Sequence, residues 1–278
     1  SSATQTLSGI ISGSGTLTKD TGSSSVLTLS NTNTYSGITT ISAGTISISA
    51  DANLGTAASL TATQLTLSGG TLKTTTDLTL ATNRGITLST NGGTIEVANT
   101  TTIYGGTIAG TTTFTKSGAG TFVLTGTKTD TASPTYVVIA AGTFTVRADA
   151  PNINGQTFTG AGNLIIEPAS VSFSTNPLDT SNIHLVGVTS GVASSGILGT
   201  LTIGKSGNLG TINISGNITT AGNQTFYGPV TLSADITSTV TSGTVNFIGT
   251  VNSSTSFTDR SLTVSGGTLK LDGIVGQT

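Results

Sequence analysis

The side chains that could perform acid–base chemistry are few and far apart in this sequence. His184 is the only histidine among 278 residues, and Asp179 lies shortly before it. Serines are abundant, so a Ser–His–Asp arrangement is formally possible, but no G-x-S-x-G sequence stands on a strand–turn–helix. We therefore expect His184 to be structural or simply exposed, and we expect no catalytic residue in the chain.

Paired carboxylates would be the other signature of a catalytic site, because glycosidases act with two of them. The acidic residues are spread thinly and form no D-D or D-x-D pair. They are Asp20, Asp51, Asp77, Glu96, Asp130, Asp149, Glu167, Asp179, Asp235, Asp259 and Asp272. Two of them could meet on adjacent coils of a repetitive fold, although chance alone allows that. A polysaccharide-active enzyme is therefore a minor alternative, and the main expectation is that the chain is not an enzyme.

Metal-binding patterns are also missing from the sequence. Calcium-binding β-helical repeats carry G-G-x-G-x-D runs. The glycine pairs of this chain lack the aspartate; they are Gly69-Gly70, Gly92-Gly93, Gly105-Gly106 and Gly266-Gly267. There is no cysteine, and hence no disulfide framework and no thiolate chemistry. We expect no metal site and no cofactor.

Aromatic and threonine side chains are the remaining candidates for a binding surface. Phe122, Phe144 and Phe247 occupy positions that should point inward from strands, so we expect them in the core. Tyr35 and Tyr227 lie in loop-like segments and are the candidates for exposed rings. Regular threonine arrays can bind ice, but the threonine runs at 74–76 and 111–113 lack strict spacing, which leaves this a minor option.

Charge and hydrophobicity argue against two classes of partner. Nine basic and eleven acidic residues give a net charge of −2, and the basic residues are scattered from Lys19 to Lys270. Binding to nucleic acid normally needs a concentrated basic patch. No apolar run approaches the roughly 20 residues of a membrane-spanning helix, and the sequence starts without a basic and apolar leader. We expect no nucleic-acid partner and no membrane span, and the low charge with abundant Ser, Thr and Gly favours a secreted protein.

The elements that would carry any such site follow a repeat. Gly-Thr followed by an apolar–polar–apolar strand recurs along the chain, for example at 44–48, 93–97, 120–124, 142–146 and 267–271. The clearest stretch, 110–146, predicts four short strands separated by turns. No segment has the spacing of an amphipathic helix. A loose period of about 20 to 30 residues is the signature of a solenoid.

A short alternating strand cannot bury its apolar face alone. Coiling the chain so that equivalent strands stack in parallel, about 4.8 Å apart, buries those faces in one interior. At about 22 residues per coil the chain would form roughly a dozen coils. The sequence therefore predicts an all-β protein, a right-handed parallel β-helix (β-solenoid). The hand is chosen because large, irregular coils fit that class.

Two stretches carry a more specific pattern. Residues 14–45 and 114–144 follow the order L-x-K-x-G-x-G-x-L-x-L, then N-T-Y-x-G and I-x-x-G-T, with departures at 20–23 and 129–134. This order resembles the passenger-associated repeat of autotransporters and other large secreted bacterial surface proteins. The resemblance covers about a quarter of the chain. It implies a right-handed β-helix at the bacterial cell surface, and it implies nothing about activity.

Domain organisation is expected to be simple. Residues 1–150 should form a β-helix with passenger-type repeats, and residues 151–278 should continue it, with looser, loop-rich coils near 150–200. Neither terminus shows an obvious cap, so the terminal coils at 1–20 and 260–278 are expected to join head to tail. This predicts an extracellular structural protein that self-assembles into a filament, sheath or surface layer. The alternative is an adhesin passenger or stalk that binds a glycan or another cell-surface ligand.

Overall fold

The computed structural model is all-β, with nearly no helix. It describes residues 3–57, 61–129, 135–151, 156–174, 178–179, 183–185, 197–254 and 259–276. The chain forms two compact units, residues 1–143 and residues 144–278. Parallel strands stack as a β-solenoid of about 10 turns in all, which confirms the predicted β-helix. Its predicted right hand stays a prediction.

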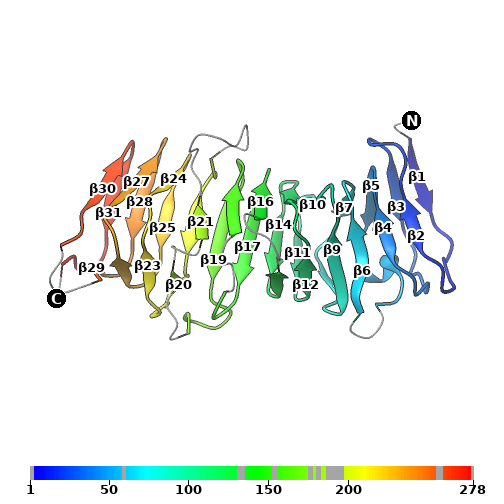
Figure 1. The fold of residues 1–278 in the computed structure, drawn as a ribbon, viewed down its shortest axis with the longest axis horizontal. Coiled ribbons are helices and arrows are strands. Elements are labelled where there is room, and N and C mark those ends of the chain that lie inside the picture. The colour runs from blue at the N-terminus through cyan, green and yellow to red at the C-terminus, as the bar shows by residue number, and fades with distance from the viewer. Residues whose placement is uncertain are drawn as a thin grey trace. The chain divides into compact units, whose positions relative to one another are not determined.

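Unit 1 winds its chain around three sheets, visible as the blue to green strands of Figure 1. Sheet A has the order β1-β3-β5-β7-β10-β13-β16, sheet B the order β2-β4-β6-β9-β12-β15, and sheet C begins β8-β11-β14. The strands are β1 Thr4–Leu7, β2 Leu17–Lys19, β3 Val26–Leu29, β4 Thr39–Ile41, β5 Thr45–Ile48, β6 Thr61–Leu67, β7 Thr71–Thr74, β8 Leu78–Leu80, β9 Arg84–Leu88, β10 Gly93–Val97, β11 Thr101–Tyr104, β12 Thr107–Ala109, β13 Phe114–Ser117, β14 Thr121–Leu124, β15 Thr127–Thr129 and β16 Thr135–Ile139. One 3-10 helix, η1 (Asp51–Leu54), follows β5.

Unit 2 repeats the scheme in the green to red strands of Figure 1. Its sheets have the orders β17-β19-β22-β25-β28-β31, β20-β23-β26-β29 and β24-β27-β30, and β18 pairs with β21. The strands are β17 Thr143–Arg147, β18 Gln156–Thr159, β19 Asn163–Glu167, β20 Leu178–Asp179, β21 Ile183–Leu185, β22 Leu201–Ile203, β23 Ile212–Ile214, β24 Ile218–Thr220, β25 Gln224–Phe226, β26 Val230–Leu232, β27 Ile236–Val240, β28 Thr244–Phe247, β29 Val251–Ser253, β30 Leu262–Ser265 and β31 Thr268–Leu271.

The pairing register of the strands explains why the alternation of apolar and polar residues predicted the fold. Partners stack position on position, so that Leu27 lies beside Ile46, Ile46 beside Leu72, and Leu72 beside Ile95. Successive residues of a strand point to opposite faces. Aliphatic side chains therefore form continuous inward columns, while the Thr and Ser residues between them form columns on the outside.

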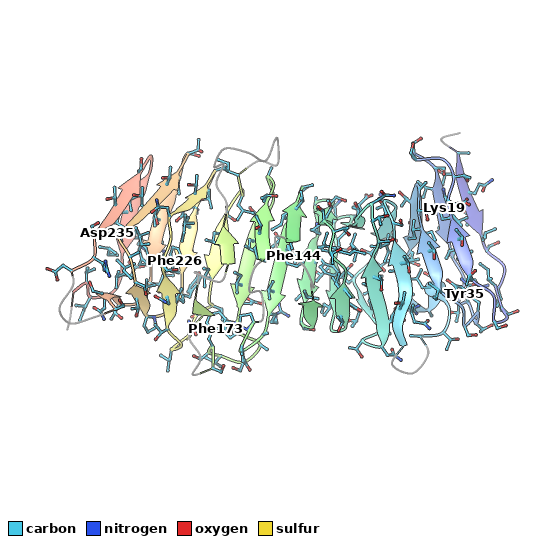
Figure 2. The ribbon with its side chains drawn as sticks, in the orientation of Figure 1. Lys19, Tyr35, Phe144, Phe173, Phe226 and Asp235 are labelled. Atoms are coloured by element: carbon cyan, nitrogen blue, oxygen red, sulfur yellow. The ribbon has the colours of Figure 1, made fainter. Side chains whose placement is uncertain are left out.

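The core contains the aromatic residues that the sequence placed there. Phe122, Phe144 and Phe247 are all at most 1% exposed, as expected. In unit 2, the rings of Phe226 and Phe247 stack at a centroid distance of 4.8 Å; Phe226 is labelled in Figure 2. Burial of such rings stabilises each unit, since a large aromatic side chain removes about 150–250 Å² from water.

The four strands predicted at 110–146 correspond to β13, β14, β16 and β17. The polar run between the second and third also contains a short strand, β15, which the sequence reading missed. Part of the looser coils expected at 150–200 lies outside the described residues, namely 152–155, 175–177, 180–182 and 186–196.

Candidate functional site

Seven carboxylates of the described residues contact backbone N–H groups or basic side chains rather than each other; they are Asp51, Asp77, Glu96, Asp149, Glu167, Asp235 and Asp272. Asp77, Asp149 and Asp235 lie at coil corners, and their Oδ1 atoms accept hydrogen bonds from the backbone N–H groups of Thr101, Ser170 and Ser261, one coil later, at 2.6, 2.7 and 2.9 Å. The Ser170 and Ser261 bonds lower the pKa of Asp149 and Asp235 because they favour the charged form. These aspartates act as cross-coil caps.

Other carboxylates form ion pairs. Glu96 meets Lys73 at 2.6 Å, and Glu167 meets Arg147 at 2.6 Å. Asp272 meets Lys270 at 3.0 Å. Among the described residues, no group of three or more His, Cys, Asp or Glu lies close enough to hold a metal ion. These carboxylates therefore have structural partners in the coils.

His184 and Asp179 lie in neighbouring segments of unit 2. His184 is in β21, where its backbone pairs with Thr157 of β18. Asp179 is in β20, where its backbone pairs with Asn213 of β23. The side chains of both residues lie outside the described part of the structure, so the expectation that His184 is structural or exposed stays a prediction.

The prediction that the Tyr35 ring is exposed is wrong. Its side chain is 2% exposed, and its hydroxyl lies 2.7 Å from Thr39 Oγ1 inside the coil (Figure 2). Burial raises the pKa of the Tyr35 hydroxyl. The loop-like sequence around it is the corner of a coil, and the ring fills the space beneath that corner. Tyr227, in contrast, is half-buried at a turn.

A buried polar cluster occupies unit 1 at η1. Arg84 is 1% exposed, and its Nε and Nη2 donate to Asp51 Oδ1 and Oδ2 at 2.9 and 3.0 Å. Its Nη1 and Nη2 also donate to the carbonyls of Leu54 and Gly55, both at 2.9 Å. The Tyr104 hydroxyl donates to the Arg84 carbonyl at 2.7 Å, and burial raises the pKa of Tyr104 to about 12. This cluster fixes η1 against the next coil and is fully hydrogen-bonded, which is typical of a structural ion pair.

Two lysines at coil corners, Lys116, which is buried, and Lys19, which is half-buried, donate hydrogen bonds to backbone carbonyls. Lys116 is fully buried, and its Nζ donates to the carbonyls of Ser117, Gly118 and Ala141 at 2.7, 2.8 and 3.1 Å. Lys19 Nζ donates to the carbonyls of Thr21 and Ala43. Sequence analysis missed these roles because it treated both lysines only as members of a repeat pattern.

The outermost strand of unit 1 presents an uncovered edge. β1 pairs with β3 on one side only, and all four of its residues are exposed. Gln5 and Leu7 stack beside Leu27 and Leu29, so they occupy inward positions. A hollow of about 380 Å³ opens here, lined in part by Gln5, Lys19 and Leu27. Lys19 is labelled among the blue coils of Figure 2.

The outermost strand of unit 2 presents a more apolar edge. β31 pairs with β28 on one side only, and its residues are exposed. Leu269 and Leu271 continue the inward columns of Val245 and Phe247, yet they are 40% and 41% exposed, whereas Val245 and Phe247 are fully buried. Ile274 and Val275 are exposed close by. The edge strands β1 and β31 are the candidate functional site, because side chains at inward positions of both are exposed in the described part of the structure.

A smaller apolar patch lies on one corner of unit 2. Val171 and Leu209 are 64% and 81% exposed. The turn that carries Leu209 is fixed by Asn208, a buried side chain that accepts from Phe173 N–H at 3.0 Å and donates to the Tyr227 carbonyl at 2.7 Å. The hydrogen bonds of Asn208 therefore fix the turn that exposes Leu209.

Comparison with family models, curated proteins and solved structures finds no match for this chain. Its repeat character therefore rests on its own sequence and coordinates. No helix among the described residues is long and apolar enough to span a membrane.

Proposed function

We propose that this chain is an extracellular structural protein whose β-solenoid self-assembles through its terminal coils into a filament, sheath or surface layer. The observation that carries the proposal is the pair of uncovered strand edges, β1 and β31, with core-type side chains exposed at inward positions. A strand edge offers unpaired N–H and C=O groups to another chain. We propose a second copy of the chain as the partner that covers these edges.

The chemistry of the edges supports head-to-tail pairing. A coil placed on β31 would bury Leu269 and Leu271, just as the coil of β31 already buries their partners Val245 and Phe247. At β1 the exposed inward position next to Gln5 is Leu7, 43% exposed. Because the two edges differ, their contact is heterologous, and a heterologous contact that does not close into a ring produces an open fibre.

The proposed location is the bacterial cell surface after secretion. It is supported by the repeat pattern at residues 14–45 and 114–144, which resembles the passenger-associated repeat, and by a sequence rich in Thr and Ser of which only 7% is charged. Columns of outward hydroxyls, such as Thr45, Thr71 and Thr94 on sheet A, replace the charges of an ordinary surface.

Sedimentation velocity of the purified chain over a concentration series tests the assembly. We expect large species that grow with concentration in the native chain and a sharp loss of them in Leu271→Lys. Leu209→Lys is the matched control, since it places the same charge on an exposed leucine away from both edges. Circular dichroism shows whether each variant keeps its β structure. A native chain that stays monomeric at every concentration would overturn the proposal.

A second candidate function is adhesion, which the Val171 and Leu209 patch favours. Exposed aliphatic side chains on a corner held by a buried hydrogen-bonding residue are suited to contact a ligand. A glycan array and a cell-binding assay test this candidate. Binding lost in Leu209→Lys and retained in Leu271→Lys would favour the adhesin over the assembling protein.

A further inference from the structure

The two copies of the passenger-type repeat share a hydrogen bond between successive coils that the sequence analysis did not predict. In each copy a lysine of one coil donates a hydrogen bond to the carbonyl of an alanine one coil later, and that alanine is followed by Gly-Thr. Lys19 bonds to Ala43 at 3.2 Å, and Lys116 bonds to Ala141 at 3.1 Å. The separations along the chain, 24 and 25 residues, correspond to one coil.

Lys116 is a charged residue in a buried column of aliphatic side chains. It occupies an inward position of β13, between Ile95 of β10 and Ile139 of β16, in a column that is otherwise aliphatic. A buried ammonium is costly unless its donors are satisfied. Lysine has three N–H donors, and three carbonyls receive them here. Two carbonyls belong to its own corner and the third belongs to the next coil, so the ammonium joins two consecutive corners.

Glycine makes this convergence of carbonyls possible. Gly118 and Gly142 have φ of 75° and 66°, and Gly22 and Gly44 have φ of 66° and 69°, so each lysine is flanked by two left-handed glycines on successive coils. A Cβ on Gly44 would lie 2.7 Å from Lys19 Nζ. Glycine is therefore required both for the backbone conformation and for room beside the ammonium.

We propose that the lysine and the Ala-Gly-Thr corner of the following coil form a register lock, which fixes the alignment of one strand against the next. A slip of two residues keeps every side chain on its proper face, so alternation alone does not oppose it. Such a slip moves Lys116 away from the Ala141 carbonyl and leaves a buried N–H without its partner. The lock thus penalises the alternatives that repetitive Thr-rich strands otherwise permit. It acts within the chain and does not depend on the proposed assembly.

Disulfide trapping tests the lock, because the chain has no native cysteine. Thr115 and Val138 are partners across β13 and β16, so Thr115→Cys with Val138→Cys reports the native register. Thr115→Cys with Ala140→Cys reports a slip of two residues, since diagonal positions lie beyond disulfide reach in the native register. In the native background only the first pair should oxidise.

In the Lys116→Met background we expect the slipped pair to gain about tenfold in oxidised fraction, as expected from loss of a charge-assisted hydrogen bond. Lys73→Met is the control, because Lys73 is an outward residue paired with Glu96. The same experiment at the first lock uses Lys19→Met with Thr18→Cys and Thr40→Cys for the native register, and with Thr18→Cys and Ser42→Cys for the slip.

The edge coil gives a second test because loss of Lys19 disturbs a strand with a single neighbour in sheet B. A rise of the slipped pair in either lysine variant, absent in Lys73→Met, supports the lock. If both lysine variants keep their circular dichroism and the slipped pairs stay reduced, the lysines only add stability and the lock is overturned.

Discussion

The two units solve the same packing problem with different buried polar groups. Unit 1 fully buries two cations, Arg84 and Lys116, in addition to the amides Asn33, Asn53 and Gln64. Among the described residues of unit 2, the large buried polar side chains are the neutral amides Asn208 and Gln224. Both units otherwise consist of parallel strands with aliphatic and aromatic columns. The comparison shows that a β-solenoid can bury charged side chains or only neutral amides. The free energy of unfolding lost on removing such a side chain should differ between the two cases.

The loss should differ because a buried charge has a large desolvation penalty, which only its full set of hydrogen-bond partners offsets. Arg84 is held by Asp51 and by two backbone carbonyls, and removing it leaves the carbonyls without a donor and the 23% exposed Asp51 carboxylate without its cation. An amide that loses its partners is less costly, since its desolvation penalty is smaller. Substitutions should therefore affect unit 1 more than unit 2, and the predictions below order those effects.

Arg84→Met should have the largest effect. Arg84 itself is 1% exposed, so removing it leaves the Leu54 and Gly55 carbonyls without a donor and the partly exposed Asp51 carboxylate without its cation, at a cost of about 3 kcal/mol. Urea unfolding followed by circular dichroism measures the loss. Arg147→Met in unit 2 is the control, since Arg147 and Glu167 form a pair that is partly exposed and worth at most about 1 kcal/mol. Equal losses in the two variants would contradict the proposed difference between the units.

Lys116 should make stability depend on pH. Burial lowers the pKa of Lys116 to about 8, and nearby Glu96 opposes that shift. The unfolded chain, with a pKa near 10.5, therefore binds more protons between pH 8 and 10.5, so stability should rise with pH across that window. The gain is on the order of 1–3 kcal/mol.

Urea midpoints at pH 7.5, 9 and about 10.5 check this behaviour. In Lys116→Met the rise should disappear, while Lys73→Met should retain it. A native chain whose stability is flat or falls across the window would show that the buried ammonium is not destabilised by its surroundings.

Gln224→Met should have the smallest effect. The Gln224 side chain is fully buried, and its Nε2 donates to the Thr239 carbonyl at 3.0 Å. Its Oε1 accepts no hydrogen bond from the described residues. Replacing the amide by an apolar side chain of similar length should change the free energy of unfolding by less than about 1.5 kcal/mol. A loss of stability as large as that of Arg84→Met would contradict the proposal that unit 1 is more sensitive than unit 2 to such substitutions.

Particular residues show what the sequence could and could not predict. The Gly-Thr punctuation and the alternation around Phe122 and Phe247 were enough for parallel strands and an aromatic core, because these signals are local. Tyr35 was assigned wrongly because the surface beneath a corner is created by another coil. Asp51 and Arg84 lie 33 residues apart, more than one coil, so their pairing depends on a coil length that varies along the chain.

The candidate site was predictable only in part. The sequence indicated segments 1–20 and 260–278 as candidate joints, and the structure adds the exposed side chains at their inward positions, Leu7, Leu269 and Leu271. Cross-coil partners, such as Asp77 with the Thr101 N–H, could not be assigned because no fixed period specifies which residue stacks on which.

Negative-stain electron microscopy of the purified chain across a concentration series tests the central claim most directly. The account predicts filaments or sheets with a regular subunit repeat at high concentration, shortening on dilution and absent in Leu271→Lys. Isolated particles at every concentration, with the native chain indistinguishable from Leu271→Lys, would contradict assembly through the terminal coils.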